Sequence, residues 1–162
     1  MKSILNSFAV GLLLLSASCN FSKGVKKDLG TGLSASYNGF AIEDIYLTAD
    51  DQKLSNNSIS LGNKVDIVAT GVHNYKVKDG RVYPACTIIL KDKSGKELLS
   101  LPDAFSDRTN GFGENEASTL SATINTGDPM VAGETYHFSA KFYDKLQPAS
   151  VIDANVDIVV KK

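Results

Sequence analysis

Apolar and polar side chains alternate along most of the sequence beyond residue 31. The clearest run is Thr135–Tyr143, whose apolar positions recur at every second residue: Tyr136, Phe138, Ala140 and Phe142. A period of two is typical of a β-strand with one buried face. The same pattern predicts seven further strands, at residues 33–37, 40–48, 64–72, 85–91, 97–101, 118–126 and 154–160.

Turn-forming residues separate these runs. Glycine follows a short polar residue at Asn38-Gly39, Asp79-Gly80, Ser94-Gly95 and Asn110-Gly111, which is the chemistry that tight turns need. Short, regularly spaced strands joined by such turns predict an all-β fold, an antiparallel β-sandwich of about seven to eight strands. We expect residues 31–162 to form this sandwich domain.

One turn is specific enough to predict a hairpin. In Asp92–Glu97 the late glycine, Gly95, suits a type I turn closed by a left-handed glycine bulge. The strand before it places Cys86, Ile88 and Leu90 on one face. With no free cysteine left to pair with it, we expect Cys86 to be a buried, inert thiol and not a nucleophile.

The segment Met130–Tyr136 resembles the chain before strand F of fibronectin type III and related immunoglobulin-like domains. In those domains an apolar residue, a glycine turn and a tyrosine form the tyrosine corner, whose hydroxyl bonds back to the upstream backbone. The resemblance implies that Tyr136 is the corner tyrosine and Gly133 its turn. The sequence departs from the pattern at Ala132, where fibronectin domains often have proline, and it has no tryptophan.

The first residues predict secretion. Met1-Lys2 is a short positive start, Phe8–Leu15 is an apolar run, and small residues follow, so residues 1–18 are interpreted as a signal peptide. Ala17-Ser18-Cys19 resembles the lipobox of bacterial, Bacteroidetes-like lipoproteins. This resemblance implies acylation of Cys19, for example with palmitate, although Ser16 stands where leucine is usual. An ordinary secreted protein is the alternative.

Residues 19–30 are expected to form the lipidated N-terminus and a flexible tether. Lys23, Lys26 and Lys27 there contact anionic lipid headgroups or are simply solvated, and the sequence leaves both open. Asn20 lacks the Asp seen after the cysteine in lipoproteins of the inner membrane, which favours an outer-membrane lipoprotein. The sequence does not decide whether it faces the periplasm or the cell surface.

Composition and charge exclude several classes of protein and of binding partner. The chain is 43% hydrophobic and 22% charged, which excludes a disordered chain and a coiled coil. Residues 31–162 hold thirteen basic and seventeen acidic side chains, a net charge of −4, so nucleic acid is not an expected partner. His73 and His137 have no metal-binding spacing, and no GxSxG elbow is present, so we expect no enzyme and no cofactor.

Binding is the function that remains for a small anchored sandwich, and loops are where it would occur. The candidate contact residues for a protein or glycan partner are Tyr75, Arg81, Tyr83 and Phe112. The loop 73–84 could equally be a solvated hairpin extension. The sequence therefore predicts a non-catalytic binding or adhesion module of the cell envelope, or alternatively an accessory structural subunit of an envelope assembly without a small-molecule ligand.

The loop 102–117 is rich in oxygen ligands. Its candidate metal ligands are Asp103, Asp107, Asn110, Glu114 and Glu116, with Asn115 beside them. Six to eight oxygens suit Ca²⁺, but the spacing is not that of an EF-hand. The hypotheses are an irregular calcium site and a solvated acidic loop.

Overall fold

The computed structural model describes residues 22–162. Its strands are β1 (Lys23–Lys27), β2 (Ser34–Asn38), β3 (Asp44–Ala49), β4 (Gln52–Lys53), β5 (Ser58–Ser60), β6 (Lys64–Thr70), β7 (Pro84–Asp92), β8 (Glu97–Leu101), β9 (Thr119–Asn125), β10 (Thr135–Asp144) and β11 (Gln147–Lys161). A single turn of 3₁₀ helix, η1 (Glu116–Ser118), precedes β9. Cys19 and the signal peptide lie outside the described residues.

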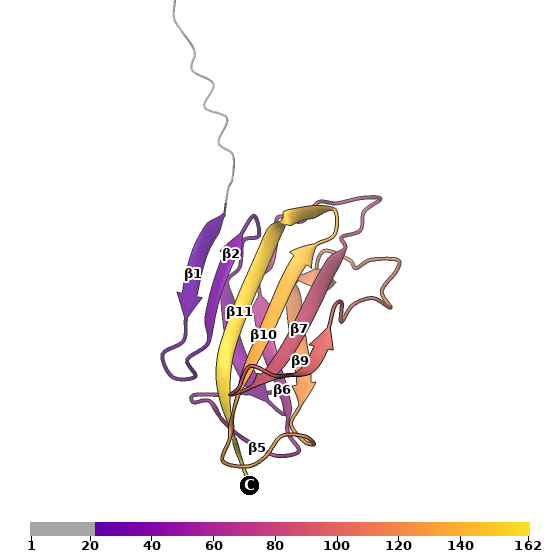
Figure 1. Ribbon diagram of the computed structural model, residues 1–162. Coiled ribbons are helices and arrows are strands. Elements are labelled where there is room, and N and C mark those ends of the chain that lie inside the picture. The colour runs from indigo at the N-terminus through magenta and orange to yellow at the C-terminus, as the bar shows by residue number, and fades with distance from the viewer. Residues whose placement is uncertain (1–21) are drawn as a thin grey trace, which may run out of the picture.

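The strands form two sheets that pack face to face (Figure 1). The larger sheet has the order β1-β2-β11-β10-β7-β8, with β5 added beside the end of β11, and the second sheet has the order β4-β3-β6-β9. All pairs are antiparallel except β5 with β11. The predicted antiparallel sandwich is confirmed. It has eleven strands because β1, β4 and β5 add to the predicted set.

The strand order follows that of immunoglobulin domains. In the larger sheet β11-β10-β7-β8 corresponds to G-F-C-C′, and in the second sheet β3-β6-β9 corresponds to A-B-E. Constant-type immunoglobulin domains place a strand D beside E. Among the described residues no strand takes that position, because the chain between β8 and β9 forms a long connection instead.

The core lies between the inward faces of the two sheets. Along β10 buried and exposed residues alternate as predicted, with Phe138 and Phe142 fully buried. β7 contributes Cys86, Ile88 and Leu90 from its inward face, and Phe40 fills the space before β3. A period of two therefore sets which residues are buried.

Both local predictions are confirmed. In the β7–β8 hairpin the N–H of Gly95 donates to the carbonyl of Asp92 at 2.9 Å, and Gly95 has a φ of 87°. At the tyrosine corner the backbone N–H of Val131 donates to the hydroxyl of Tyr136 at 2.7 Å. The hydroxyl oxygen is thus the acceptor that satisfies a backbone donor in the turn before β10.

Part of the segment predicted to be a flexible tether, residues 19–30, is a strand in the larger sheet. Lys23–Lys27 are strand β1, which pairs with β2 along its full length from Lys23↔Asn38 to Lys27↔Ser34. Glycine allows this docking, since a Cβ at Gly24 would overlap the phenol of Tyr37. An aromatic ring packed over a strand glycine is a known way to stabilise the edge of a sheet. Three lysines in five residues gave β1 the composition of a linker, so it was not predicted as a strand.

The corner hydrogen bond predicts the effect of two matched substitutions. Tyr136→Phe removes an acceptor and leaves the Val131 N–H unpaired, so we expect a loss of about 1–3 kcal/mol of unfolding free energy. Tyr143→Phe, on the outward side of the same strand, should cost much less. Urea denaturation of both variants measures the difference, and equal losses would contradict the role of the corner.

Candidate binding pocket

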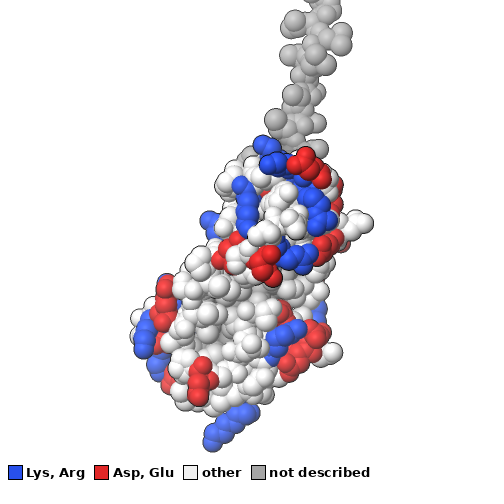
Figure 2. All heavy atoms as spheres, turned by 90° about the vertical axis from the view of Figure 1, so that its right-hand side faces the viewer, with Lys and Arg blue, Asp and Glu red and all other residues white. Residues whose placement is uncertain are grey.

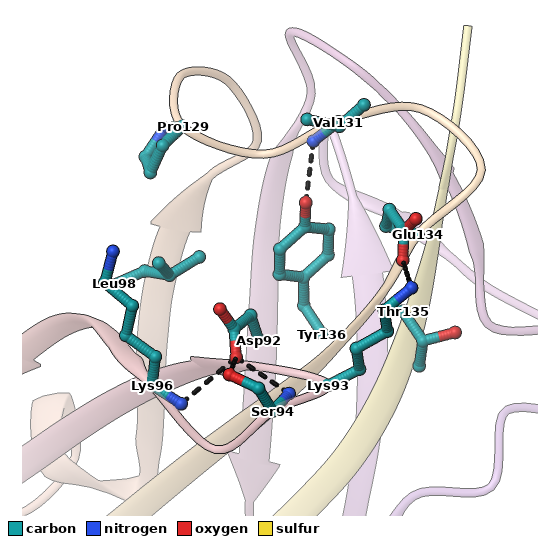
Figure 3. Close-up of a pocket in the computed structure, with 10 residues that line it drawn as sticks. All are labelled: Asp92, Lys93, Ser94, Lys96, Leu98, Pro129, Val131, Glu134, Thr135 and Tyr136. Carbon is teal, nitrogen blue, oxygen red and sulfur yellow. Dashed lines mark hydrogen bonds and ion pairs between the residues drawn. The ribbon is translucent and has the colours of Figure 1, made fainter.

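A pocket of about 310 Å³ lies at one end of the larger sheet. It is bounded by the β7–β8 hairpin and by the loop that leads into β10 (Figure 3). The two segments meet because β7 pairs with β10, with Asp92 opposite Tyr136. This volume is at the lower limit for ligand-binding pockets, so the occupant would be a small molecule or one end group of a larger one.

The pocket has apolar walls. Leu98, Pro129, Val131 and the ring of Tyr136 line it, and Figure 3 shows Pro129 and Val131 on the loop above Leu98 and Tyr136. Val131 is 59% exposed, so its aliphatic side chain is accessible to a ligand. Tyr136 is itself buried, and its hydrogen bond to Val131 fixes the loop over the strand.

Two of the charged groups in the pocket, Lys93 and Asp92, already have partners within the protein. The ammonium of Lys93 lies 2.6 Å from the carboxylate of Glu134, and this interaction raises the pKa of Lys93. The Asp92 carboxylate accepts bonds from the Ser94 hydroxyl and from the backbone N–H groups of Ser94 and Lys96. These bonds, with the Ser94 hydroxyl first, lower the pKa of Asp92.

Lys96 is the remaining cation of the pocket. Its side chain is exposed and extends past Leu98 in Figure 3, and it makes no ion pair within residues 22–162. An apolar wall beside a free ammonium suits a group that has an apolar surface and a carboxylate, phosphate or hydroxyl next to it.

The residues predicted to contact a partner lie at the other end of the sandwich. Arg81, Tyr83 and Phe112 are brought together with Tyr75, but largely as packing. Phe112 is buried in a small cluster with Val82 and Ala117, and Tyr75 packs against the same cluster. Of the four predicted contact residues, Phe112 is thus buried, and Tyr75 is half-buried against the same cluster.

Hydrogen bonds explain why this loop is structural. The Tyr75 hydroxyl donates to the carbonyl of Ala117 at 2.8 Å. The guanidinium of Arg81 donates to the carbonyls of Asn110 and Gly111. Tyr75, Arg81 and Tyr83 are each half-buried. The aromatic residues Tyr75 and Phe112 thus belong to a small hydrophobic cluster outside the main core, which we call the satellite core.

The candidate calcium ligands are not gathered at one point. The Asp103 carboxylate faces inward, where it accepts the backbone N–H groups of Cys86 and Phe105 and pairs with Lys145 at 2.7 Å. Glu116 pairs with Arg108. Asp107, Asn110 and Glu114 are exposed. In the part of the chain that the structure covers, no group of three or more acidic, His or Cys side chains could hold a metal ion, so the calcium hypothesis gains no support.

Cys86 is a buried free thiol, as predicted. Burial, with a smaller effect from the Asp103 carboxylate, raises its pKa to about 12. The thiolate is therefore negligible near neutral pH, and the side chain acts as a small apolar group of the core.

The pocket is built from two segments that the sequence marks as separate local motifs, the hairpin at 92–97 and the corner at 130–136. Nothing in the local sequence indicates that they meet. Their adjacency follows from the β7–β10 register, which no local pattern specifies. The available signal in the sequence is an apolar residue, Val131, within the turn that precedes Gly133.

No protein-family model matches the sequence, and no curated protein sequence matches it. Among solved structures, the C-terminal domain of wzt is similar, with a TM-score of 0.47 and 13% identity over 89% of this chain and 80% of that chain. Within residues 22–162 there is no helix with the length and hydropathy of a membrane span.

The environment of Asp103 predicts a pH-dependent loss of stability. Burial raises the pKa of Asp103, but the Lys145 ammonium and the N–H groups of Phe105 and Cys86 outweigh it, so the net shift is downward. A lowered pKa stabilises the fold above the unfolded pKa of about 3.9 and ceases to do so as the pH falls through the folded value. Asp103→Asn should therefore cost about 1–3 kcal/mol at neutral pH and less at pH about 3.

Urea midpoints at the two pH values measure this effect. Asp107→Asn is the matched control, because Asp107 is exposed and makes no ion pair among the described residues. A loss for Asp103→Asn that stays the same at both pH values would show that the ionised carboxylate is not the stabilising group.

Proposed function

We propose that this protein is a lipid-anchored protein of the cell envelope, held in the outer membrane through Cys19, that acts as a non-catalytic binding or adhesion module. The support in the sequence is the signal peptide and the lipobox-like Ala17-Ser18-Cys19. The support in the fold is the position of the pocket relative to the start of the domain.

That position is the observation that carries the proposal. The registers align Lys23 with Asn38, Val151 and Tyr143 across four strands. Tyr136, in the pocket, lies seven residues back along β10, or about 23 Å at a strand rise of about 3.3 Å per residue. An anchor at Cys19 would thus hold one end of the sandwich at the membrane and present the pocket at the opposite end.

The shortened tether strengthens this orientation. Since β1 is part of the sheet, only residues 19–22 would link the lipid to the fold, a reach of about 13 Å. Lys23 and Lys27 are exposed on β1, and Val25 between them is 63% exposed. Such a surface favours contact with anionic headgroups. The pocket end remains available for a protein or glycan partner.

Processing at Cys19 provides the first test. Cys19→Ser should move the protein from the membrane pellet to the soluble fraction and abolish labelling with a palmitate analogue, because acyl chains supply the membrane affinity. Ser18→Ala keeps a small residue before the cysteine and serves as the control that should still be labelled. Labelling that persists in Cys19→Ser would remove the lipoprotein interpretation.

Binding through the pocket provides the second test, with fragments of cell envelope as the probe. Val131→Asp and Lys96→Glu should each weaken retention of the protein on the fragments by about tenfold, since about 1.4 kcal/mol of contact is lost. Val77→Asp is the control, because Val77 is 47% exposed in the loop at the opposite end. Equal weakening by all three variants would assign the binding surface elsewhere.

A second function, an accessory subunit that packs against partner proteins, has one specific observation in its favour. The side of the sandwich formed by β8 and β9 has unpaired strand edges and exposed leucines, Leu99 and Leu101. Single anchored domains usually protect such features. In Figure 2 charged side chains lie at the upper end and along both flanks of this side, and they leave a broad area between them uncharged.

A further inference from the structure

The four edges of the two sheets are protected unequally. β1 carries Lys23, Lys26 and Lys27 among its five residues, and β4 is two residues long. β8 has a register shift opposite Leu90/Lys91 and is followed directly by a proline. Charges, prolines, bulges and shortness are the features that prevent a strand edge from pairing with another chain.

β9 has none of these features. Its sequence, Thr-Leu-Ser-Ala-Thr-Ile-Asn, contains no charge and no proline. It pairs with β6 over all seven residues without a register shift. β9 is also the last strand of its sheet, at the position where an immunoglobulin strand D would follow. A long, regular and uncharged edge is thus left at a position that the fold normally fills.

The register shows which backbone groups are unpaired. The N–H of Thr126 donates to the carbonyl of Asn63 at 2.9 Å. In an antiparallel pair every second residue bonds to the partner strand, so Leu120, Ala122 and Ile124 bond to β6. The N–H and C=O groups of the alternate residues therefore point away from β6: Thr119, Ser121, Thr123 and Asn125.

The larger sheet provides apolar cover above this edge. Leu99 and Leu101 of β8 pair with Leu90 and Ile88, so they share the inward face of the sheet. They are nevertheless 38% and 39% exposed. The second sheet ends at β9, which contacts β7, so among residues 22–162 no strand lies opposite β8. A strand added beside β9 would bring its inward side chains beneath these leucines.

The charge pattern decides what kind of strand fits. Viewed from this side, the lower half of the molecule has a broad uncharged area, with Lys, Arg, Asp and Glu gathered around it (Figure 2). A charged side chain placed here would lose water and gain no counter-charge. The surface is complementary to a segment without charges that has apolar residues at alternate positions.

A second copy of the chain fits less well. Two β9 strands pair antiparallel only about a two-fold axis perpendicular to the sheet, which would point the two Lys23 ends in opposite directions. Under the proposed anchoring, each Lys23 is about 13 Å or less from its lipid, so the pair could not stand on one membrane surface. This step alone rests on the proposed lipid anchor.

We propose that β9 receives an extended, uncharged strand from a partner protein, antiparallel to β9 and in the position of the missing strand D. This deepens the accessory-subunit function by naming the contact that the partner makes. Addition of a strand supplies backbone hydrogen bonds for affinity, and the alternate side chains give specificity. Leu99 and Leu101 would select apolar residues on the inward face of the added strand.

The C-terminus allows a test that does not require the natural partner. The carbonyl of Lys161 accepts the N–H of Leu61, and the next residue, Gly62, donates to Thr126, directly after β9. The full chain with Cys19→Ser is extended after Lys162 by a Gly–Ser linker of about six residues. A strand of alternating threonine and valine, as long as β9, follows. The linker places this strand at an effective concentration in the millimolar range, antiparallel to β9.

We expect amide hydrogen exchange at Ser121 and Thr123 to slow by about tenfold relative to a Gly–Ser extension of equal length. The melting temperature should also rise. Replacing the valines of the added strand by lysines should abolish both effects. Ser121→Pro, which removes an outward N–H without touching the β6 ladder, should abolish the slowing at Thr123 and the rise in melting temperature. Ser121→Ala should preserve both effects.

Two results would overturn the proposal. One is exchange at Ser121 and Thr123 that is the same in the Thr–Val and Gly–Ser extensions. The other is a dimer of the unextended chain in sedimentation that Ser121→Pro dissociates, because the edge would then belong to a second copy. Neither result depends on acylation of Cys19, so failure here is distinguishable from failure of the lipid anchor.

Discussion

Three phenylalanines, Phe40, Phe138 and Phe142, lie fully buried between the two sheets. Aromatic side chains contribute the largest buried areas of a core, and here they act without covalent support, since Cys86 is a free thiol in the described chain. Burial of alternate residues must therefore offset most of the chain entropy lost on folding. The inward side chains of the strands are used for packing in that core. The ends and edges of the sheets are therefore the parts available for contacts with other molecules.

The sequence predicted strands with apolar residues at alternate positions and missed β1, β4 and β5, which are too short or too polar to have this pattern, although β5 buries Ile59. β7 and β10 have apolar residues at every second position because one face of each is buried. β1 has two exposed lysines and an exposed Val25, and it is held by backbone pairing with β2 and by Tyr37 over Gly24. Such a strand has the composition of a linker, so a pattern of hydrophobicity cannot find it.

In the candidate site, too, local motifs could be predicted from the sequence and contacts between distant segments could not. Each of its two segments has a recognisable turn motif, and the motifs were predicted correctly from local chemistry. The pocket itself exists only because β7 and β10 are neighbours with Asp92 opposite Tyr136. Conversely, Tyr75 and Phe112 have the composition of a contact surface, yet they pack with Val82 and Ala117. Burial in a satellite core depends on the path of the connection from β8 to β9, which local sequence does not specify.

The pairing of β1 with β2 has a mechanical consequence. Under the proposed anchoring, a ligand that pulls on the pocket end while the lipid holds residue 19 applies tension along β1. Hydrogen bonds between strands run perpendicular to the strand direction, so this tension shears all five β1–β2 residue pairs together and does not peel them apart in turn. The edge strand would then act as a clamp that keeps the sandwich folded under load, and Tyr37, packed over Gly24, would resist the sliding of one strand past the other.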